Sequence, residues 1–188
     1  MSTLAAVNVV EEIQALKKER NAIILAHHYQ EPEIQEIADA IGDSLELARK
    51  AKELECDVIA FCGVWFMAET AKILNPSRTV IVPDREAGCS LVDSCPVEMV
   101  RAFKAKYPDH VVVSYINTSA DVKAESDVCC TSGNAVKVVE SLGVDRVIMI
   151  PDEFLAQNVA AQTRVKIIAW KGFCEVHERS EEHTSELQ

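Results

Sequence analysis

Several features that identify common classes of protein are missing from this sequence of 188 residues. It has no run of five like charges and its formal net charge is −11, so nothing in it indicates a nucleic-acid partner. Its apolar stretches are far shorter than the roughly 20 residues of a membrane-spanning helix. Residues 1–20 lack the basic start of a secretion signal and have the pattern of an amphipathic helix. These absences predict a cytosolic protein.

The sequence also lacks the spacings of common cofactor motifs. It contains seven cysteines but no CxxC pair, which argues against a zinc ribbon and a thioredoxin-type motif. Disulfides are not expected either, because the cytosol keeps thiols reduced. The segment "GDSLEL" is not the GxGxxG fingerprint of a dinucleotide site. Each cysteine is therefore a buried small side chain or a metal ligand, and we assign Cys56 and Cys62, beside or within a predicted strand, to the first kind.

Short apolar runs rich in Val and Ile alternate with helical patterns along the chain. The predicted strands are Ala22–Ala26, Val58–Cys62, Thr79–Val82, Val111–Tyr115, Arg146–Ile150 and Val165–Ala169. The predicted helices are Leu4–Arg20, Pro32–Ala40, Ser44–Leu54, Trp65–Leu74, Pro96–Tyr107, Ser132–Leu142 and Glu153–Thr163. Strands of this kind, separated by helices, form parallel sheets covered on both faces. The sequence therefore predicts an α/β protein made of three-layer αβα units.

The second half of the chain repeats the pattern of the first half. A shift of 88 residues brings the two halves into register without a gap over a long stretch, followed by a connection that we expect to be three residues shorter in the second copy. The coinciding pairs include His27 with Tyr115, Tyr29 with Asn117, Ser44 with Ser132, Val80 with Val165, Val82 with Ile167, and Cys89 with Cys174. We predict two copies of one α/β unit, at residues 1–88 and 89–173.

Polar residues follow the first strand of each copy at equivalent positions. His27 and Tyr29 lie at the end of one strand, and Tyr115 and Asn117 lie at the end of the other. Open α/β sheets bind ligands beyond the carboxyl ends of their parallel strands. We therefore predict a binding site to which each copy contributes one pair. The alternative is that His27 or His28 merely caps a strand.

Two serines precede helical patterns, Ser44 in "GDSLELARKA" and Ser132 in "CTSGNAVKVVESL". Each has the position of an N-cap or first-turn residue. A helix N-terminus offers backbone N–H groups and the positive end of the helix dipole, which bind carboxylates and phosphates. We predict that both serines face the same site and that its ligand is a small polyanion, with plain helix capping as the alternative.

One cysteine follows the last strand of each copy, Cys89 in "REAGCSL" and Cys174 in "WKGFCEVH". A loop cysteine at such a strand exit can bind a soft metal. Two thiolates are too few for a [4Fe–4S] cluster, which takes three or four ligands. Cys95, Cys129 and Cys130 have no counterpart in the other copy and stay open as further ligands. The residues alone thus allow an enzyme, a non-catalytic iron–sulfur or zinc protein, or a metal-free anion-binding module.

Several long motifs occur in order between Ile13 and about Glu178. They are "LAHHYQ", "GDSLELARKA", "FCGVWFMAETAKILNP", "GCSLVDSCP", "YINTSADVKAESDVCCTSGNAVKVV" and "CEVH". Together they resemble the quinolinate synthase family, the A protein of bacterial NAD biosynthesis. The resemblance implies three α/β domains related by pseudo-threefold symmetry, and a [4Fe–4S] cluster held by one cysteine from each domain, with the fourth iron position open for substrate.

The resemblance also implies an activity and roles for particular residues. The family condenses iminoaspartate (iminosuccinate) with dihydroxyacetone phosphate to quinolinate, with iminoaspartate supplied by an aspartate oxidase or dehydrogenase. By motif, the cluster ligands are Cys89 and Cys174, and Tyr29 resembles the tyrosine placed for proton transfer, with His27 as its catalytic partner. The implied substrate contacts are His27, Ser44, Tyr115, Ile116, Asn117 and Ser132.

The resemblance stops soon after "CEVHER". The family continues with another α/β unit that contains an "HPE"-type motif with a glutamate, a later threonine and the third cluster cysteine; here residues 174–178 only begin such a unit. The tail at 179–188, "RSEEHTSELQ", can be encoded by a common sequencing adapter, which predicts a non-native end. We therefore expect an N-terminal fragment that is inactive as an enzyme by itself.

Overall fold

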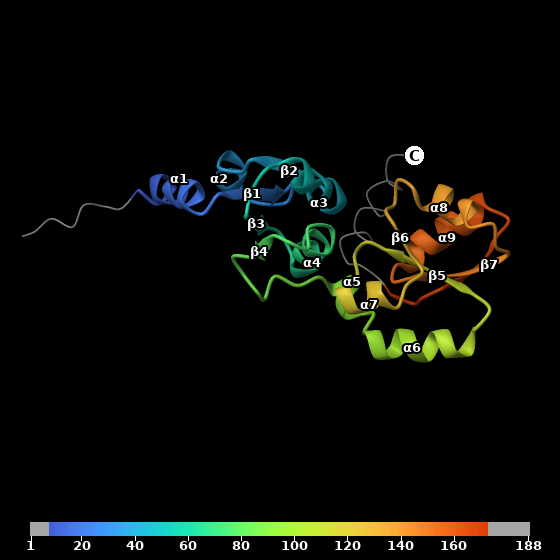
Figure 1. The fold of residues 1–188 in the computed structure, drawn as a ribbon. Coiled ribbons are helices and arrows are strands. Elements are labelled where there is room, and N and C mark those ends of the chain that lie inside the picture. Colours follow the sequence, from blue (N-terminus) through green and yellow to red (C-terminus); the bar gives the residue numbers. More distant parts are fainter. Residues whose placement is uncertain (1–7, 173–188) are drawn as a thin grey trace, which may run out of the picture. The chain divides into compact units, whose positions relative to one another are not determined.

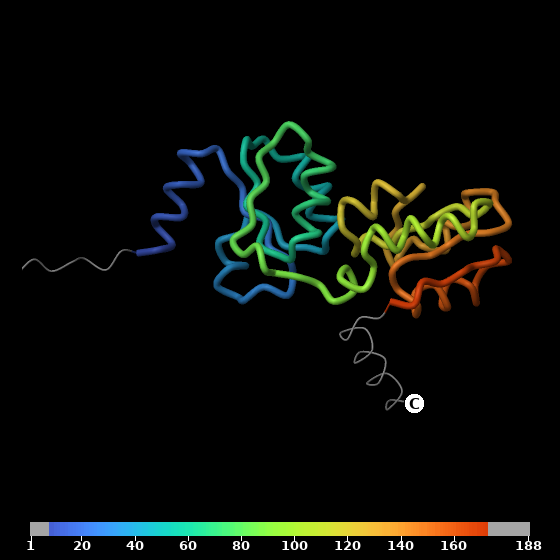
Figure 2. The backbone as a smooth tube through the Cα atoms, turned by 90° about the horizontal axis from the view of Figure 1, so that it is seen from below, coloured from blue at the N-terminus to red at the C-terminus, as the bar shows by residue number. Residues whose placement is uncertain are grey.

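The computed structural model of this protein describes residues 8–172, which belong to two compact units, each built on a parallel β-sheet (Figure 1). Unit 1 is Met1–Ala87 and unit 2 is Gly88–Gln188. Figure 2 traces the chain through unit 1 in blue to green and through unit 2 in light green to red. The predicted α/β class is confirmed. The predicted start of a third unit and the predicted non-native tail lie outside the described residues.

Unit 1 alternates helices with four parallel strands. The central strand β1 is an apolar run buried on both faces, as expected for a parallel strand between helices. The short helix α2 begins at Pro32, whose fixed φ suits a first helical turn. Helix α3 begins after the capping residue Asp43. The elements are α1 (Val9–Glu19), β1 (Ala22–His27), α2 (Pro32–Glu36), β2 (Ala40–Gly42), α3 (Ser44–Glu53), β3 (Val58–Cys62), α4 (Trp65–Leu74) and β4 (Thr79–Ile81).

Unit 2 has the same order of strands and helices as unit 1, with one extra short helix, α5, at its start. Ser119 caps α7 and Asp152 caps α9, because each side chain accepts a hydrogen bond from a backbone N–H of the first turn. The elements are α5 (Ser90–Asp93), α6 (Val97–Lys106), β5 (Val111–Tyr115), α7 (Ala120–Ala124), β6 (Val128–Cys130), α8 (Ala135–Ser141), β7 (Arg146–Ile150), α9 (Glu153–Gln162) and β8 (Lys166–Ala169). Among the helices within 8–172, none combines the length and the apolar content that crossing a bilayer requires.

All of the strands predicted from apolar runs are present, but some short elements were not predicted. The predicted helix Pro32–Ala40 is wrong beyond Glu36, because Ala40 begins strand β2. Strands β2 and β6 and helices α5 and α7 contain only three to five residues each, which is too short for a hydrophobic period to appear. Of the predicted helix Leu4–Arg20, the structure describes α1 from Val9 onward.

The two sheets have the same strand order, β2-β1-β3-β4 in unit 1 and β6-β5-β7-β8 in unit 2. Their pairing registers also agree after the shift of 88 residues. Leu25 pairs with Ala40 in unit 1, and the equivalent Val113 pairs with Val128 in unit 2. The same strand order and register in both units confirm the repeated arrangement that the sequence predicts.

The sequence alignment of the last strands is wrong by two residues. Val80 pairs with Ile59, and the residue that pairs with the equivalent Val147 is Ile167. Val80 therefore corresponds to Ile167 and not to Val165. A slip of two residues keeps each side chain on the same face of the sheet, so the apolar pattern alone could not detect it.

Alternate side chains of the unit 2 strands pack in two separate layers. Val113 and Met149 pack with α8 and α9, whereas Val112 and Ile148 pack with α6 and α7. Figure 1 shows α6 on the opposite side of β5 from α8 and α9. Unit 2 therefore has the predicted three layers.

In unit 1, only one face of the sheet is covered as completely as both faces of the unit 2 sheet are. Phe61 of β3 is fully buried, whereas its neighbour Cys62 is half-buried. Helix α1 is the equivalent of α6 under the 88-residue shift, but none of its residues is buried. In α6 the inward residues are Val100 and Phe103, and the corresponding residues of α1, Glu12 and Ala15, offer little apolar surface.

One aspartate in each unit fixes the short edge strand against the central strand. The Oδ2 atom of Asp39 accepts a hydrogen bond of 2.7 Å from the N–H of Ile24, and Oδ2 of Asp127 accepts one of 2.7 Å from the N–H of Val112. The backbone N–H of each aspartate donates in return to the carbonyl of the same strand residue, at 2.8 and 3.0 Å. This reciprocal pair extends pairings of only three residues each, β1 with β2 and β5 with β6.

We predict that Asp127→Ala lowers the free energy of unfolding by about 1–3 kcal/mol, because it leaves the N–H of the buried strand residue Val112 without its carboxylate acceptor. Asp127→Asn should cost less, since the amide oxygen can still accept. Urea unfolding measures both, with the exposed Asp109→Ala as the control. Equal midpoints for Asp109→Ala and Asp127→Ala would show that this hydrogen bond does not stabilise the unit.

Candidate functional site

In unit 1 the predicted site residues lie at the carboxyl end of β1. His27 is the last residue of the strand and is buried, whereas Tyr29 is 81% exposed. The Nδ1 atom of His27 accepts a hydrogen bond of 3.3 Å from the N–H of Tyr29, and the two rings meet edge to face with centroids 4.7 Å apart. A neutral imidazole that accepts at Nδ1 has its proton on Nε2. His27 can therefore donate one hydrogen bond to a ligand.

The surroundings of His27 favour this neutral form. Burial lowers the pKa of His27, and the neighbouring His28 lowers it further, while the carboxylate of Asp43 raises it in part. The ring of His28 lies edge to face with that of His27, with centroids 6.1 Å apart. An imidazole that stays neutral near pH 7 is suited to donating or accepting a proton.

The start of α3 lies at the same edge of the sheet, because β2 leads directly into it. Ser44 is the first residue of the helix and is buried, in agreement with the predicted first-turn position. The cap is Asp43, whose Oδ1 accepts hydrogen bonds from the N–H groups of Leu45 and Glu46 at 2.9 and 2.8 Å. These two N–H groups are therefore occupied by a carboxylate of the chain itself, and a ligand here would meet the hydroxyl of Ser44.

In unit 2 the loop after β5 contains the equivalent residues. Tyr115 and Asn117 are half-buried, whereas the side chain of Ile116 is buried and its N–H donates to the carbonyl of Cys130 at 2.9 Å. Below this loop the hydroxyls of Ser114 and Thr118 are fully buried and lie 3.0 Å apart. Tyr115 and Asn117 thus present a phenol and an amide where unit 1 presents an imidazole and a phenol.

The predicted helix start at Ser132 is wrong. Helix α8 begins at Ala135 with Asn134 as its N-cap, and Ser132 is an exposed turn residue. The side-chain oxygen of Asn134 accepts a hydrogen bond of 2.7 Å from the N–H of Thr131, which closes the turn before the helix starts. The later start of α8 was missed because Ser132 is also a favourable capping residue type.

The segment before each predicted cluster cysteine is anchored in the same way. The N–H of Trp65, the first residue of α4, donates to the carbonyl of Ala87 at 2.8 Å, and the N–H of Glu153, the first residue of α9, donates to that of Gly172 at 3.0 Å. These carbonyls lie two residues before Cys89 and Cys174. Cys174 itself lies outside the described residues. Equivalent contacts therefore hold the backbone at Ala87 and at Gly172.

Burial separates Cys89 from two of the other candidate ligands. Cys95 and Cys130 are buried among apolar side chains, and burial raises the pKa of each thiol to about 12. Such thiols do not readily form the thiolate that binds a metal. Cys89 is half-buried at the start of α5, and Cys129 is exposed. Within residues 8–172, no three His, Cys, Asp or Glu side chains lie together as a metal site.

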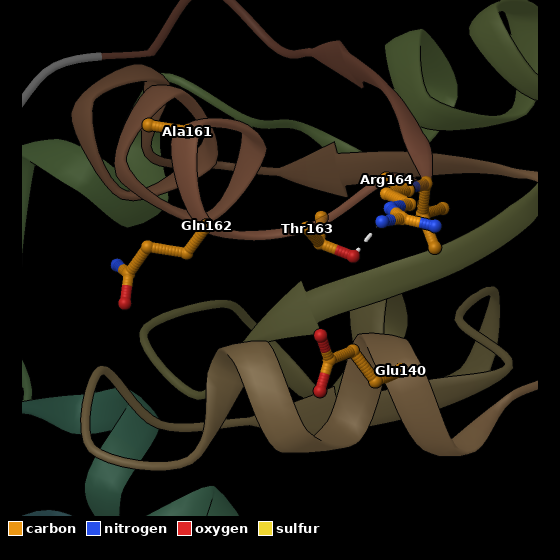
Figure 3. A pocket seen from close by; sticks show the side chains of 6 residues that line it. Glu140, Ala161, Gln162, Thr163 and Arg164 are labelled. Atoms are coloured by element: carbon orange, nitrogen blue, oxygen red, sulfur yellow. Dashed lines mark hydrogen bonds between the residues drawn. The ribbon is translucent and has the colours of Figure 1, made fainter.

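The cavities of unit 2 are separate from these residues. A polar pocket of about 520 Å³ is lined by Glu140 and residues 161–165, between the ends of α8 and α9 and the start of β8 (Figure 3). Its Thr163 hydroxyl accepts a hydrogen bond of 3.3 Å from the N–H of Val165. An apolar cavity of about 530 Å³ lies between α6 and β8, beside Phe103 and Trp170. Neither cavity contains a residue of the predicted site.

Comparison with known proteins connects these features to one family. The family model described as "Quinolinate synthetase A protein" matches residues 11–187. Similar curated proteins include "Quinolinate synthase 2" of Mesorhizobium japonicum (64% identical, covering 90% of this chain and 53% of that protein) and "Quinolinate synthase" of Agrobacterium fabrum (63%, 90% and 49%). "Quinolinate synthase" of Xylella fastidiosa strain Temecula1 is 61% identical, over 91% of this chain and 51% of its own length. The chain spans about half the length of these relatives.

The neutral state of His27 can be tested with two substitutions that should shift its pKa in opposite directions. His28→Asn should raise the pKa of His27 by removing a like charge, and Asp43→Asn should lower it further while the amide oxygen still caps α3. A pKa below the usual value of about 6.5 also means that the unfolded state takes up this proton first, so stability should fall as the pH drops below that value. NMR titration of the His27 ring measures each shift. Shifts of the same sign in both variants would contradict this account.

Proposed function

The chain belongs to the quinolinate synthetase A protein family, and we propose that it is the N-terminal part of an enzyme that condenses iminoaspartate with dihydroxyacetone phosphate to quinolinate. The observation that supports this proposal most directly is the high identity, over nine-tenths of the chain, to proteins named quinolinate synthase. A cytosolic location, and supply of iminoaspartate by an aspartate oxidase or dehydrogenase, belong to the same proposal.

The proposed cofactor is a [4Fe–4S] cluster with Cys89 and Cys174 as two of its ligands. Cys89 suits this role because its side chain is only half-buried and the backbone two residues earlier is fixed to α4. When bound, such a cluster would supply an open iron position that acts as a Lewis acid on a substrate oxygen.

The chain's own residues would bind the substrates and move protons. We propose that His27 donates its Nε2 proton to a substrate carboxylate or carbonyl, because Nδ1 already accepts from the backbone. The exposed phenol of Tyr29 packs on that imidazole and can exchange a proton with a substrate. The polar groups of the substrates would be bound by the hydroxyls of Tyr115, Ser44 and Ser132, the amide of Asn117 and the loop at Ile116.

The cluster proposal is tested by anaerobic reconstitution, with iron and sulfide, of the complete protein recovered from source DNA. Cys89→Ala and Cys174→Ala should each lose most of the brown iron–sulfur absorption, because each removes a thiolate ligand. The exposed Cys129→Ser is the matched control and should keep it. Loss of the colour in Cys129→Ser, with retention in Cys89→Ala, would assign the ligands to a different set of cysteines. No colour in any protein would favour a metal-free anion-binding module.

The activity proposal is tested on the complete reading frame recovered from source DNA. The complete protein should form quinolinate from iminoaspartate and dihydroxyacetone phosphate, and residues 1–188 alone should not, because the third cluster ligand would be missing. Quinolinate is measured by chromatography after anaerobic assay. A complete protein that carries the cluster but forms no quinolinate would refute the proposed activity, and turnover by residues 1–188 would refute the assignment of essential residues beyond them.

A further inference from the structure

We infer that Gln35 and Lys123 are equivalent positioning residues, which hold the two loops that the proposed function assigns to substrate binding. The inference rests on that proposed function. Under the 88-residue shift Gln35 corresponds to Lys123, and the two residues have no chemical similarity beyond a side-chain nitrogen that donates hydrogen bonds. Nothing in the sequence alone marks this pair.

Each nitrogen donates to the same backbone position of its loop. Nε2 of Gln35 donates to the carbonyl of Gln30 at 2.7 Å and to that of His28 at 3.1 Å. Nζ of Lys123 donates to the carbonyl of Thr118. Gln30 and Thr118 correspond under the same shift. In each unit, therefore, the side chain binds the carbonyl of the residue five positions before it, at the end of the loop.

These contacts fix the end of the loop that lies away from the sheet. The start of each loop is held by strand pairing: the N–H of His28 donates to Gly42 at 3.3 Å, and the N–H of Ile116 donates to Cys130 at 2.9 Å. The other end is held by the short helix α2 or α7, through Gln35 or Lys123. Tyr29 and Asn117 lie between the two attachments, so a lost contact would let these side chains move relative to the strand.

Because the two donor side chains differ in charge, substitutions can distinguish a positioning role from an effect of the charge. Both side chains are half-buried and both reach a loop carbonyl, but Lys123 brings a positive charge and Gln35 does not. An exchange of the two residue types therefore keeps a donor at each position while it moves the charge. If positioning is the role, the exchanged variants retain function and variants without a donor lose it.

The test compares Lys123→Met and Gln35→Leu with the donor-retaining exchanges Lys123→Gln and Gln35→Lys, all in the complete protein. A misplacement on the scale of 1 Å can reduce catalysis about a hundredfold, so we expect kcat/KM to fall by about ten- to a hundredfold in the two variants without a donor, mainly through kcat. The exchanged variants should stay within about threefold of the parent, an effect too small to indicate a lost contact. Lys137→Met, at an exposed position on α8, is the control and should match the parent.

A second measurement on the 188-residue chain does not depend on activity. Amide hydrogen exchange at Thr118, whose N–H donates to the carbonyl of Ile116, should become about five- to tenfold faster in Lys123→Met, because the end of the loop opens more often without the contact to the Thr118 carbonyl. In Lys123→Gln it should return to the parent rate. Unchanged exchange and unchanged kcat/KM in Lys123→Met would overturn the inference. Equal impairment of Lys123→Gln and Lys123→Met would do so as well, because the charge and not the contact would then matter. A parent without activity would refute the proposed function, and the exchange rates would still decide the positioning role.

Discussion

The pairing of a short edge strand with the central strand is the interaction on which the rest of each unit depends. Strands β2 and β6 contain three residues each, yet they bring the chain back to the carboxyl edge of the sheet immediately before the Ser44 and Ser132 segments. Pairings this short would be weak without the reciprocal hydrogen bonds of Asp39 and Asp127. The aspartates lie at one end of the edge strand and the candidate site lies at the other.

One scaffold thus supports two different sets of functional groups. Unit 1 places an imidazole and a phenol after its central strand, which are groups that transfer protons near neutral pH or can be tuned to do so. Unit 2 places a phenol and an amide there, and the amide forms hydrogen bonds but does not transfer protons. Under the proposed function, the imidazole of His27 gives the first unit a proton-transfer group for which the second unit has no equivalent. The identical strand register explains how the groups could diverge while their backbone positions stayed equivalent.

The cysteines illustrate how burial selects among residues of one chemical type. Cys95 and Cys130 contribute to the apolar layers of unit 2, where a thiol behaves as a small hydrophobic side chain. Cys89 instead lies at the N-cap position of α5, two residues after a carbonyl that is bound by the first N–H of α4. A helix N-terminus has N–H groups to donate, and here one such group fixes the backbone that leads to the cysteine.

The sequence by itself determined the α/β class and the main strands, because apolar runs such as Ile23–Ala26 are local. It also determined the repeat, because the spacing of 88 residues between His27 and Tyr115 recurs at other pairs of positions. Only the tertiary structure decided the edge strands β2 and β6, the two-residue offset of Ile167, and the start of α8 at Ala135. The edge strands and the offset depend on hydrogen bonds between segments far apart in the chain, which leave no period in the sequence. The start of α8 depends on a local hydrogen bond between Thr131 and Asn134, at a turn where Ser132 is an equally favourable capping residue type. The anchoring contacts of Gln35 and Lys123 also needed the structure, since unlike side chains can make the same hydrogen bond wherever the backbone places a carbonyl within reach.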